Sequence, residues 1–241
     1  MYADMKNKTI LVTGAGRGIG NALCKQLATV GANVIAVTRS EEHLASLKAE
    51  HPSIMTVKLD LTDWNKTREC LAAMPELDGL VNNAGTAIIK PFAELTEQDF
   101  DDTFDVNIKA VFYVTQALDS KLIDGASVVM LSSLAASRSF AGHAAYGASK
   151  AAVDSLTEAL ALEWGPRKIR VNSVNPTVVL TKMGRDNWSD PQKSEPLLNH
   201  IPLRRFCEVS EVVDSIIYLL SSKSSFINGH HLNLEGGYSV S

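Results

Sequence analysis

The fold of this protein is decided by the stretch TILVTGAGRGIG, which runs from Thr9 to Gly20. Its first five residues are apolar or β-branched and predict a buried strand over 9–13. Glycines at 14, 18 and 20 follow at once, in a wider spacing than the common dinucleotide fingerprint, and a helical pattern continues to Gly31. Glycines let a backbone approach a pyrophosphate, and a helix N-terminus offers free N–H groups. We therefore expect a dinucleotide site here, with a tight structural turn as the alternative.

Six more predicted strands follow, at 33–38, 55–60, 78–82, 126–131, 169–175 and 231–234, and further helices are predicted at 97–120, 146–164 and 208–220. This alternation predicts one α/β domain spanning 1–241, a Rossmann-like, doubly wound parallel sheet with helices on both faces. The pattern from Thr177 to Phe206 is irregular and rich in proline. A segment of that length is typical of a substrate lid or binding loop.

Composition excludes several classes of function. The chain has 241 residues, a net charge of −4 and no basic block, which argues against nucleic acid or an anionic membrane as a partner. No apolar run is long enough for a membrane helix. The three cysteines are scattered, without the spacing of metal ligands or of a disulfide framework. We expect a cytoplasmic protein that binds a small molecule and no metal.

The strand ends carry the candidate cofactor residues. Arg39 directly follows the second strand, where an adenosine ribose should lie, and Arg17 lies in the glycine turn. Arginine at this position favours a 2′-phosphate and therefore NADP(H). The alternatives are a solvated loop charge at Arg39, or contact of the ribose with Glu41 or Glu42. Asp60 follows the third strand and is either an adenine contact or a turn residue.

A second group of residues predicts acid–base chemistry. Tyr146 and Lys150 are four residues apart, so a helix places both side chains on one face. An ammonium beside a phenol lowers the phenol's pKa, and such a tyrosine exchanges a proton with a carbonyl or alcohol oxygen. Ser133 follows the fifth strand and is placed to bind the same oxygen. Asn107 lies within an apolar helix, where it either holds a water or lies on the surface.

Together the motifs TGxxxGxG at 13–20, NNAG at 82–85, Asn107, Ser133 and Tyr146-x-x-x-Lys150 resemble the classical short-chain dehydrogenases/reductases along the whole chain. The resemblance implies seven strands in the order 3-2-1-4-5-6-7 and a homotetramer formed through the helices that end near Ser120 and Trp164. It implies that Tyr146 is the acid/base, that Ser133 polarises the carbonyl, that Lys150 holds the nicotinamide ribose, and that Asn107 keeps a water in the proton relay. The expected cofactor contacts are Gly14, Arg17, Gly18, Ile19, Gly20, Thr38, Arg39, Asp60, Leu61, Asn83, Ala84, Gly85, Tyr146, Lys150, Val179 and Thr181. Asn82 and Asn83 have an alternative role in satisfying backbone groups.

The segments NPTVVLTKMG at 175–184 and WSDP at 188–191 are similar to those of the dicarbonyl/L-xylulose reductases. That resemblance implies NADPH-dependent reduction of L-xylulose to xylitol and of α-dicarbonyls such as diacetyl. Ser133, His143, Tyr146 and Trp188 would then contact substrate, although His143 has an alternative role in tying down its loop, and Trp188 in packing the lid. Leu134 departs from the pattern, because a polar residue is expected there to bind a sugar hydroxyl. Two other hypotheses are reduction of a different ketone (a steroid, a tropinone-like ketone or an acyl thioester) and a non-catalytic nucleotide-binding scaffold.

Overall fold

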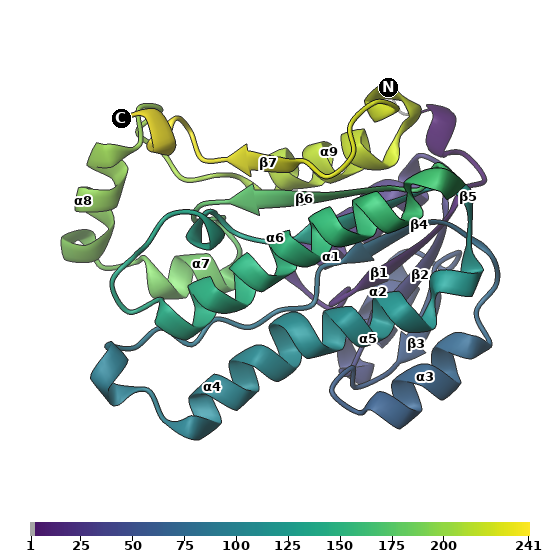
Figure 1. Ribbon diagram of the computed structural model, residues 1–241, viewed down its shortest axis with the longest axis horizontal. Helices are drawn as coiled ribbons and strands as arrows, with labels where there is room; N and C mark the ends of the chain where they lie inside the picture. The colour runs from purple at the N-terminus through teal and green to yellow at the C-terminus, as the bar shows by residue number, and fades with distance from the viewer. Residues whose placement is uncertain (1–2) are drawn as a thin grey trace.

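A computed structural model describes residues 3–241, so the first two residues of the predicted domain lie outside the described part. Within it, seven parallel strands form one sheet in the order β3-β2-β1-β4-β5-β6-β7, which confirms the predicted fold class (Figure 1). The strands are β1 (Thr9–Thr13), β2 (Asn33–Thr38), β3 (Met55–Lys58), β4 (Leu77–Asn82), β5 (Leu122–Leu131), β6 (Arg170–Pro176) and β7 (His231–Leu234). The order reverses between β1 and β4, and ligands of such sheets bind at the carboxyl ends beside this point.

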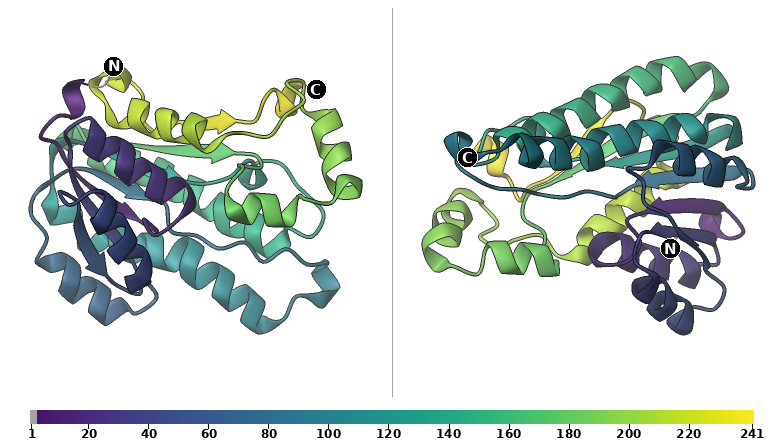
Figure 2. Two further views of the ribbon diagram at one scale, coloured as in Figure 1. Left: turned by 180° about the vertical axis from the view of Figure 1, so that it is seen from behind. Right: turned by 90° about the horizontal axis from the view of Figure 1, so that it is seen from below.

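Helices cover both faces of the sheet (Figure 2). Helices α1 (Gly18–Thr29), α2 (Glu41–Glu50) and α9 (Val209–Leu220) pack on the face that includes Val12. Helices α3 (Trp64–Ala72), α5 (Ala110–Ala117) and α6 (Ala144–Trp164) pack on the opposite face, against Leu11. Both strand residues are fully buried, as a parallel sheet covered on two sides requires. The strand ends are thereby held rigidly for a site at the sheet edge.

The helix predicted over 97–120 is confirmed over 97–117, but it contains a change of helix type. The chain forms α4 (Glu97–Phe104), a π-helical turn (Asp105–Lys109) and α5, which ends at Ala117. The wide turn contains Asn107, whose amide bonds to the backbone of Thr86, outside the helix. Helical periodicity alone does not predict this turn, because a π-helical turn is a local widening inside an α-helix.

The irregular structure expected over 177–206 is wrong in part. This segment contains α7 (Lys182–Asn187) and α8 (Pro191–His200), which lie beyond the carboxyl ends of β6 and β7 (Figure 1). Thr181 and Asp190 cap these two short helices with their side-chain oxygens. In residues 3–241 we find no helix with the length and apolar character needed to cross a membrane.

Candidate active site

The glycine turn after β1 is locked to the turn after β4. Asn83 donates from Nδ2 to the carbonyls of Thr13, at 2.9 Å, and of Gly14, at 3.1 Å. Thr13 Oγ1 accepts from the backbone N–H groups of Asn83, at 3.0 Å, and Ala84, at 3.1 Å. Asn83 therefore satisfies backbone groups, as its alternative role proposed, and by doing so it sets the shape of the predicted cofactor turn.

Gly14 is required in this turn for two reasons. Its φ is +64°, a conformation that costs an L-residue about 1–2 kcal/mol. A Cβ there would also lie 2.8 Å from Ala84 Cα, in the backbone of the second turn. Gly18 has a φ of +57° and faces Thr181 across the turn, while Gly20 is buried against the backbone of Gly14.

We expect Gly14→Ala to lower the free energy of unfolding by about 3 kcal/mol, from backbone strain together with overpacking. Gly125→Ala is the matched control, because Gly125 has a φ of +86° and open space around its Cβ position. The control should lose only about 1 kcal/mol. Urea denaturation of both variants measures the difference, and equal losses would contradict the close approach of the two turns.

The N-terminus of α1 is suited to an anion. Helices α2, α3, α4, α7 and α8 begin with a side-chain oxygen that caps a backbone N–H group, whereas Arg17 at the start of α1 provides no such cap. The first turn of α1 therefore keeps free N–H groups at the positive end of the helix dipole. Ile19 packs its side chain into the core below this turn. The donor set fits a dinucleotide pyrophosphate.

The adenosine end of the predicted site lies beside the same turn. Arg17 and Arg39 are both exposed, and no ion pair within the described chain involves either. A Cβ at Gly16 would lie 3.0 Å from Thr38 Oγ1 and 3.0 Å from His43 Nδ1. His43 is a residue that the sequence reasoning missed, and its place in the first turn of α2, three residues after the helix cap Ser40, was the available signal.

The remaining adenine-side residues lie at the end of β3 and in the turn after β4. Asp60 is exposed, and its Oδ1 accepts from the backbone and the hydroxyl of Thr62, at 3.1 and 2.8 Å. Asp60 therefore forms hydrogen bonds within its own turn. It also lies at the carboxyl edge of the sheet, where the sequence analysis placed it. Leu61 is half-buried against the core. Gly85 lies beside the Lys150 side chain, because a Cβ at this glycine would lie 3.5 Å from Lys150 Nζ.

Lys150, Tyr146 and Ser133 meet at the carboxyl end of β5. The Lys150 side chain is buried, its Nζ donates to the Leu131 carbonyl at 2.8 Å, and it lies 5.9 Å from the centre of the Tyr146 ring. Ser133 follows β5, is buried, and forms a hydrogen bond with the Tyr146 phenol. The end of β5 and the first turns of α6 thus bring together the three side chains predicted to handle the proton.

The pKa of Tyr146 differs from the sequence expectation. Burial raises it above the usual value, while the hydrogen bond from Ser133 opposes the rise. The sequence analysis expected the Lys150 ammonium to lower the Tyr146 pKa. Within this chain the effect of burial is larger, so that expectation is wrong. Burial lowers the pKa of Lys150 to about 8, against the opposing charge of Asp154. At neutral pH the phenol carries its proton and the amine is an ammonium.

Asn107 is fully buried, so its alternative place on the surface is wrong. Its Oδ1 accepts from Thr86 N at 2.8 Å, and its Nδ2 donates to Thr86 O and to Ser149 Oγ, both at 3.0 Å. The π-helical turn thus connects the loop after β4 to α6 one residue before Lys150. Such turns occur often at functional sites.

The predicted substrate contacts lie around the same centre. His143 donates from Nδ1 to the Ala141 carbonyl at 2.9 Å, which leaves Nε2 as the acceptor in the neutral ring, and its ring is 6.0 Å from that of Tyr146. It therefore ties its loop and also borders the phenol. The centre of the Trp188 ring lies 6.1 Å from that of Phe206, within the segment predicted to be the lid. Leu134 is fully buried, so its side chain packs into the protein.

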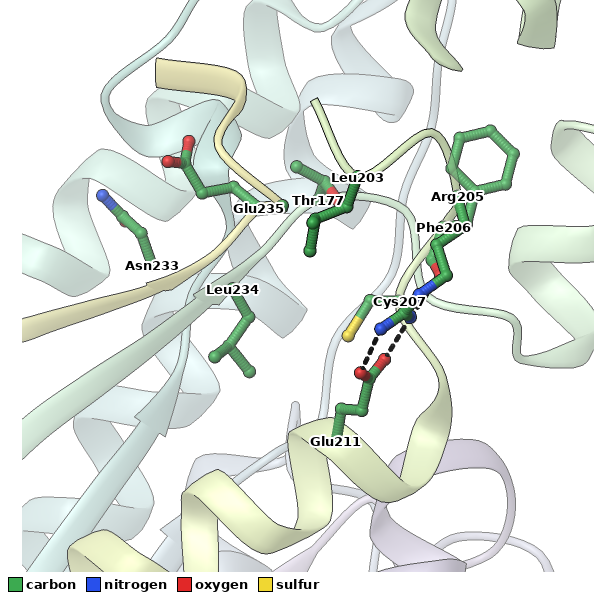
Figure 3. A pocket seen from close by; sticks show the side chains of 10 residues that line it. Thr177, Leu203, Arg205, Phe206, Cys207, Glu211, Asn233, Leu234 and Glu235 are labelled. Atoms are coloured by element: carbon green, nitrogen blue, oxygen red, sulfur yellow. Dashed lines mark hydrogen bonds and ion pairs between the residues drawn. The ribbon is translucent and has the colours of Figure 1, made fainter. Parts of the chain in front are cut away.

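The segment after β6 closes over the glycine turn. A Cβ at Gly18 would lie 3.4 Å from the Thr181 methyl group, and Val179 pairs with Cys207 in an isolated parallel bridge. Nearby is a hollow of about 230 Å³ (Figure 3). Its wall is formed by Thr177, Leu203, Arg205, Phe206, Cys207, Glu211, Asn233, Leu234, Glu235 and Gly236. Burial raises the pKa of the Cys207 thiol to about 12, so this hollow contains no reactive thiolate at neutral pH.

Comparison with known proteins agrees with this geometry. A family model described as enoyl-(acyl carrier protein) reductase matches residues 14–239. The chain is 46% identical over 243 residues to L-xylulose reductase of Mesocricetus auratus and 45% identical over 244 residues to carbonyl reductase [NADPH] 2 of Sus scrofa, and each alignment covers both chains completely. A crystal structure from Brucella melitensis, titled as a short-chain dehydrogenase/reductase of the glucose/ribitol dehydrogenase kind, is 32% identical, covers all of both chains and superposes with a TM-score of 0.93. The chain belongs to the short-chain dehydrogenase/reductase family of nicotinamide-dependent oxidoreductases.

Proposed function

We propose that this protein reduces a small carbonyl compound with NADPH, and that its substrate is L-xylulose, which it converts to xylitol. One observation supports the chemistry. The buried Lys150 ammonium lies 5.9 Å from the centre of the Tyr146 ring, and the Tyr146 phenol forms a hydrogen bond with Ser133. The substrate assignment is supported by the full-length similarity to L-xylulose reductase of Mesocricetus auratus. Reduction of α-dicarbonyls such as diacetyl is proposed for the same site.

When bound, NADPH would supply the hydride that the carbonyl carbon receives, and the chain's own residues handle the proton and the charge. Ser133 donates a hydrogen bond to the carbonyl oxygen and so stabilises the charge that develops there. Tyr146 transfers its phenolic proton to that oxygen, and the raised pKa keeps the proton available at neutral pH. Lys150 places a positive charge near the Tyr146 ring, which stabilises the phenolate left after proton transfer, and the same amine would hold the nicotinamide ribose.

We further propose that Asn107 holds a water for re-protonation of the phenol, since its amide lies at the turn between Thr86 and Ser149. His143 Nε2 and the Trp188 ring are proposed to border a small polyol, with residues 177–206 as the lid. A homotetramer and a cytoplasmic location are proposed as well, the latter supported by three free cysteines. Sedimentation and cell fractionation test these two proposals.

The substrate proposal is tested by NADPH oxidation with a panel of L-xylulose, diacetyl, a steroid ketone and an acyl thioester. We expect kcat/KM for L-xylulose and diacetyl to exceed that for the bulky substrates. Turnover of only the bulky set would replace the small-carbonyl assignment with that of another ketone reductase. Specific NADPH binding without turnover of any member would favour the nucleotide-binding scaffold.

The cofactor preference is proposed to depend on Arg39. Its exposed guanidinium is suited to a 2′-phosphate, and Arg17 lies in the adjacent turn. We expect Arg39→Asp to reduce kcat/KM with NADPH by roughly 30-fold and to leave kcat/KM with NADH within about threefold, because only NADPH has the lost charged contact. Arg68→Asp is the control, since this exposed arginine lies on α3. Equal losses with both cofactors would contradict recognition of the 2′-phosphate.

A further inference from the structure

Asp154 lies one helical turn beyond Lys150 on the same face of α6, in the series Tyr146, Lys150, Asp154 and Glu158. Its carboxylate is mostly buried, with 14% of the side chain exposed. Oδ2 accepts from Asn175 Nδ2 at 2.7 Å. Oδ1 is buried and has no hydrogen-bond partner within residues 3–241.

A buried carboxylate oxygen without a hydrogen bond is costly, so its retention needs a compensating interaction. The charged and titratable groups that face it are Lys150 and Glu158 from α6 and His231 from β7. His231 Nδ1 lies 3.6 Å from Asp154 Oδ1, and His231 Nε2 lies 2.9 Å from Glu158 Oε1. Lys150 is the buried cation among these groups, whereas Glu158 is an anion and is mostly exposed.

The same carboxylate is connected to Ser133 through a strand end. Asn175 Nδ2, which donates to Asp154, also donates to the Ser133 carbonyl at 3.3 Å. Asn175 Oδ1 accepts from Ser173 Oγ at 2.6 Å, so partners on both sides fix the orientation of the amide. The next residue, Pro176, accepts a long hydrogen bond from Ser133 Oγ at 3.5 Å. Asp154 thus contacts the residue that holds the backbone of Ser133 against β6.

We propose that Asp154 is a positioning residue for the reaction, which holds Lys150 in its charged form and, through Asn175, orients Ser133. This inference rests on the role proposed for Lys150 and adds to the catalytic set a carboxylate that contacts neither substrate nor cofactor. Burial lowers the pKa of Lys150 and the negative charge of Asp154 opposes this change, so that the pKa is about 8 in the intact chain. Removing the negative charge lowers that pKa further, so Lys150 loses its proton at a lower pH.

The test uses Asp154→Asn, in which the amide oxygen can still accept from Asn175 while the charge is lost. Lysine 15N chemical shifts of the cofactor-free protein are recorded against pH, with Lys150 assigned by its absence in Lys150→Met. We expect the Lys150 midpoint to fall by roughly one pH unit in Asp154→Asn. Glu158→Gln is the matched control, one turn further along α6 and also beside His231, and its Lys150 midpoint should stay at the wild-type value.

Activity gives a second readout. The alkaline limb of the kcat profile should move to lower pH by the same amount in Asp154→Asn, with KM for the substrate within about twofold of wild type. His231→Gln separates titration of the imidazole from that of the lysine and should leave the alkaline limb in place. If Asp154→Asn does not fold, Asp154→Ser replaces it, because serine also removes the charge and is smaller than the original side chain.

An unchanged Lys150 midpoint in the neutral variant, or an equal shift in Glu158→Gln, would overturn the proposal. Because this titration needs neither substrate nor NADPH, it is decided independently of whether L-xylulose is the substrate. A shifted midpoint with no turnover of the panel would leave Asp154 in its role and remove the proposed substrates.

Discussion

Tyr146→Phe is expected to reduce kcat for carbonyl reduction by roughly 10³-fold, because it removes the proton that the alkoxide must receive. The ring stays in place, so the contacts of Tyr146 with His143 and Lys150 are retained. The dissociation constant for NADPH should therefore change by less than about threefold. Stopped-flow measurement of hydride transfer, together with quenching of protein fluorescence by NADPH, separates the two effects.

Tyr113→Phe is the matched control for this variant. Tyr113 lies on α5 with its ring 3.8 Å from that of Trp64, in the packing between α3 and α5. Its kcat should equal that of the wild-type protein. If Tyr146→Phe retained more than about a tenth of the wild-type kcat, the phenol would not be the proton donor, and the proposed mechanism would be wrong.

Lys150→Met is expected to lower kcat/KM by roughly 10²- to 10³-fold and, unlike Tyr146→Phe, to weaken NADPH binding as well. The substitution keeps an unbranched side chain in a buried position but removes the ammonium that lies below the phenol. The phenolate formed by proton transfer then loses its neighbouring charge, and the cofactor ribose loses a donor. Steady-state kinetics and NADPH titration measure the two losses.

The control for the lysine variant is Lys48→Met. Lys48 Nζ on α2 donates to the Ile54 carbonyl at 2.8 Å, the same bond that Lys150 makes with Leu131. Comparison of the two variants separates the loss of a lysine-to-carbonyl bond from the loss of the charge at the site. A similar fall in activity in both would show that Lys150 acts through local structure alone.

Much of the site follows from local patterns in the sequence. The run of apolar residues before Gly14 predicts a strand, and the four-residue spacing of Tyr146 and Lys150 predicts a shared helix face. The structure confirms both of these features. The helix over 97–117 is also confirmed, but local patterns did not predict the π-helical turn inside it, where Asn107 contacts Thr86 outside the helix. The predicted direction of the Tyr146 pKa shift was wrong, because desolvation depends on residues distant in sequence.

For several residues the sequence left two roles open, and the contacts that bear on those roles are visible only in the folded structure. Asn83 and Asp60 make hydrogen bonds to backbone groups, and Trp188 packs against Phe206, none of which spacing can show. His43 and Asp154 drew no attention in the sequence, because a lone histidine or aspartate on a helix is common. Their surroundings are set by residues from the strands: Thr38 at the end of β2 near His43, and Asn175 and His231 on β6 and β7 beside Asp154.

The sequence by itself determined the seven strands, the glycine turn and the pair of Tyr146 and Lys150, because these depend on dihedral preferences and periodicities within a few residues. Only the tertiary structure decided that the Lys150 amine is buried with a pKa of about 8, that Asn107 leaves the helical pattern and that Asp154 lies behind the reacting groups. The physical reason is that burial and charge interactions depend on distances through space, and β6 and β7 reach α6 only after the sheet has formed.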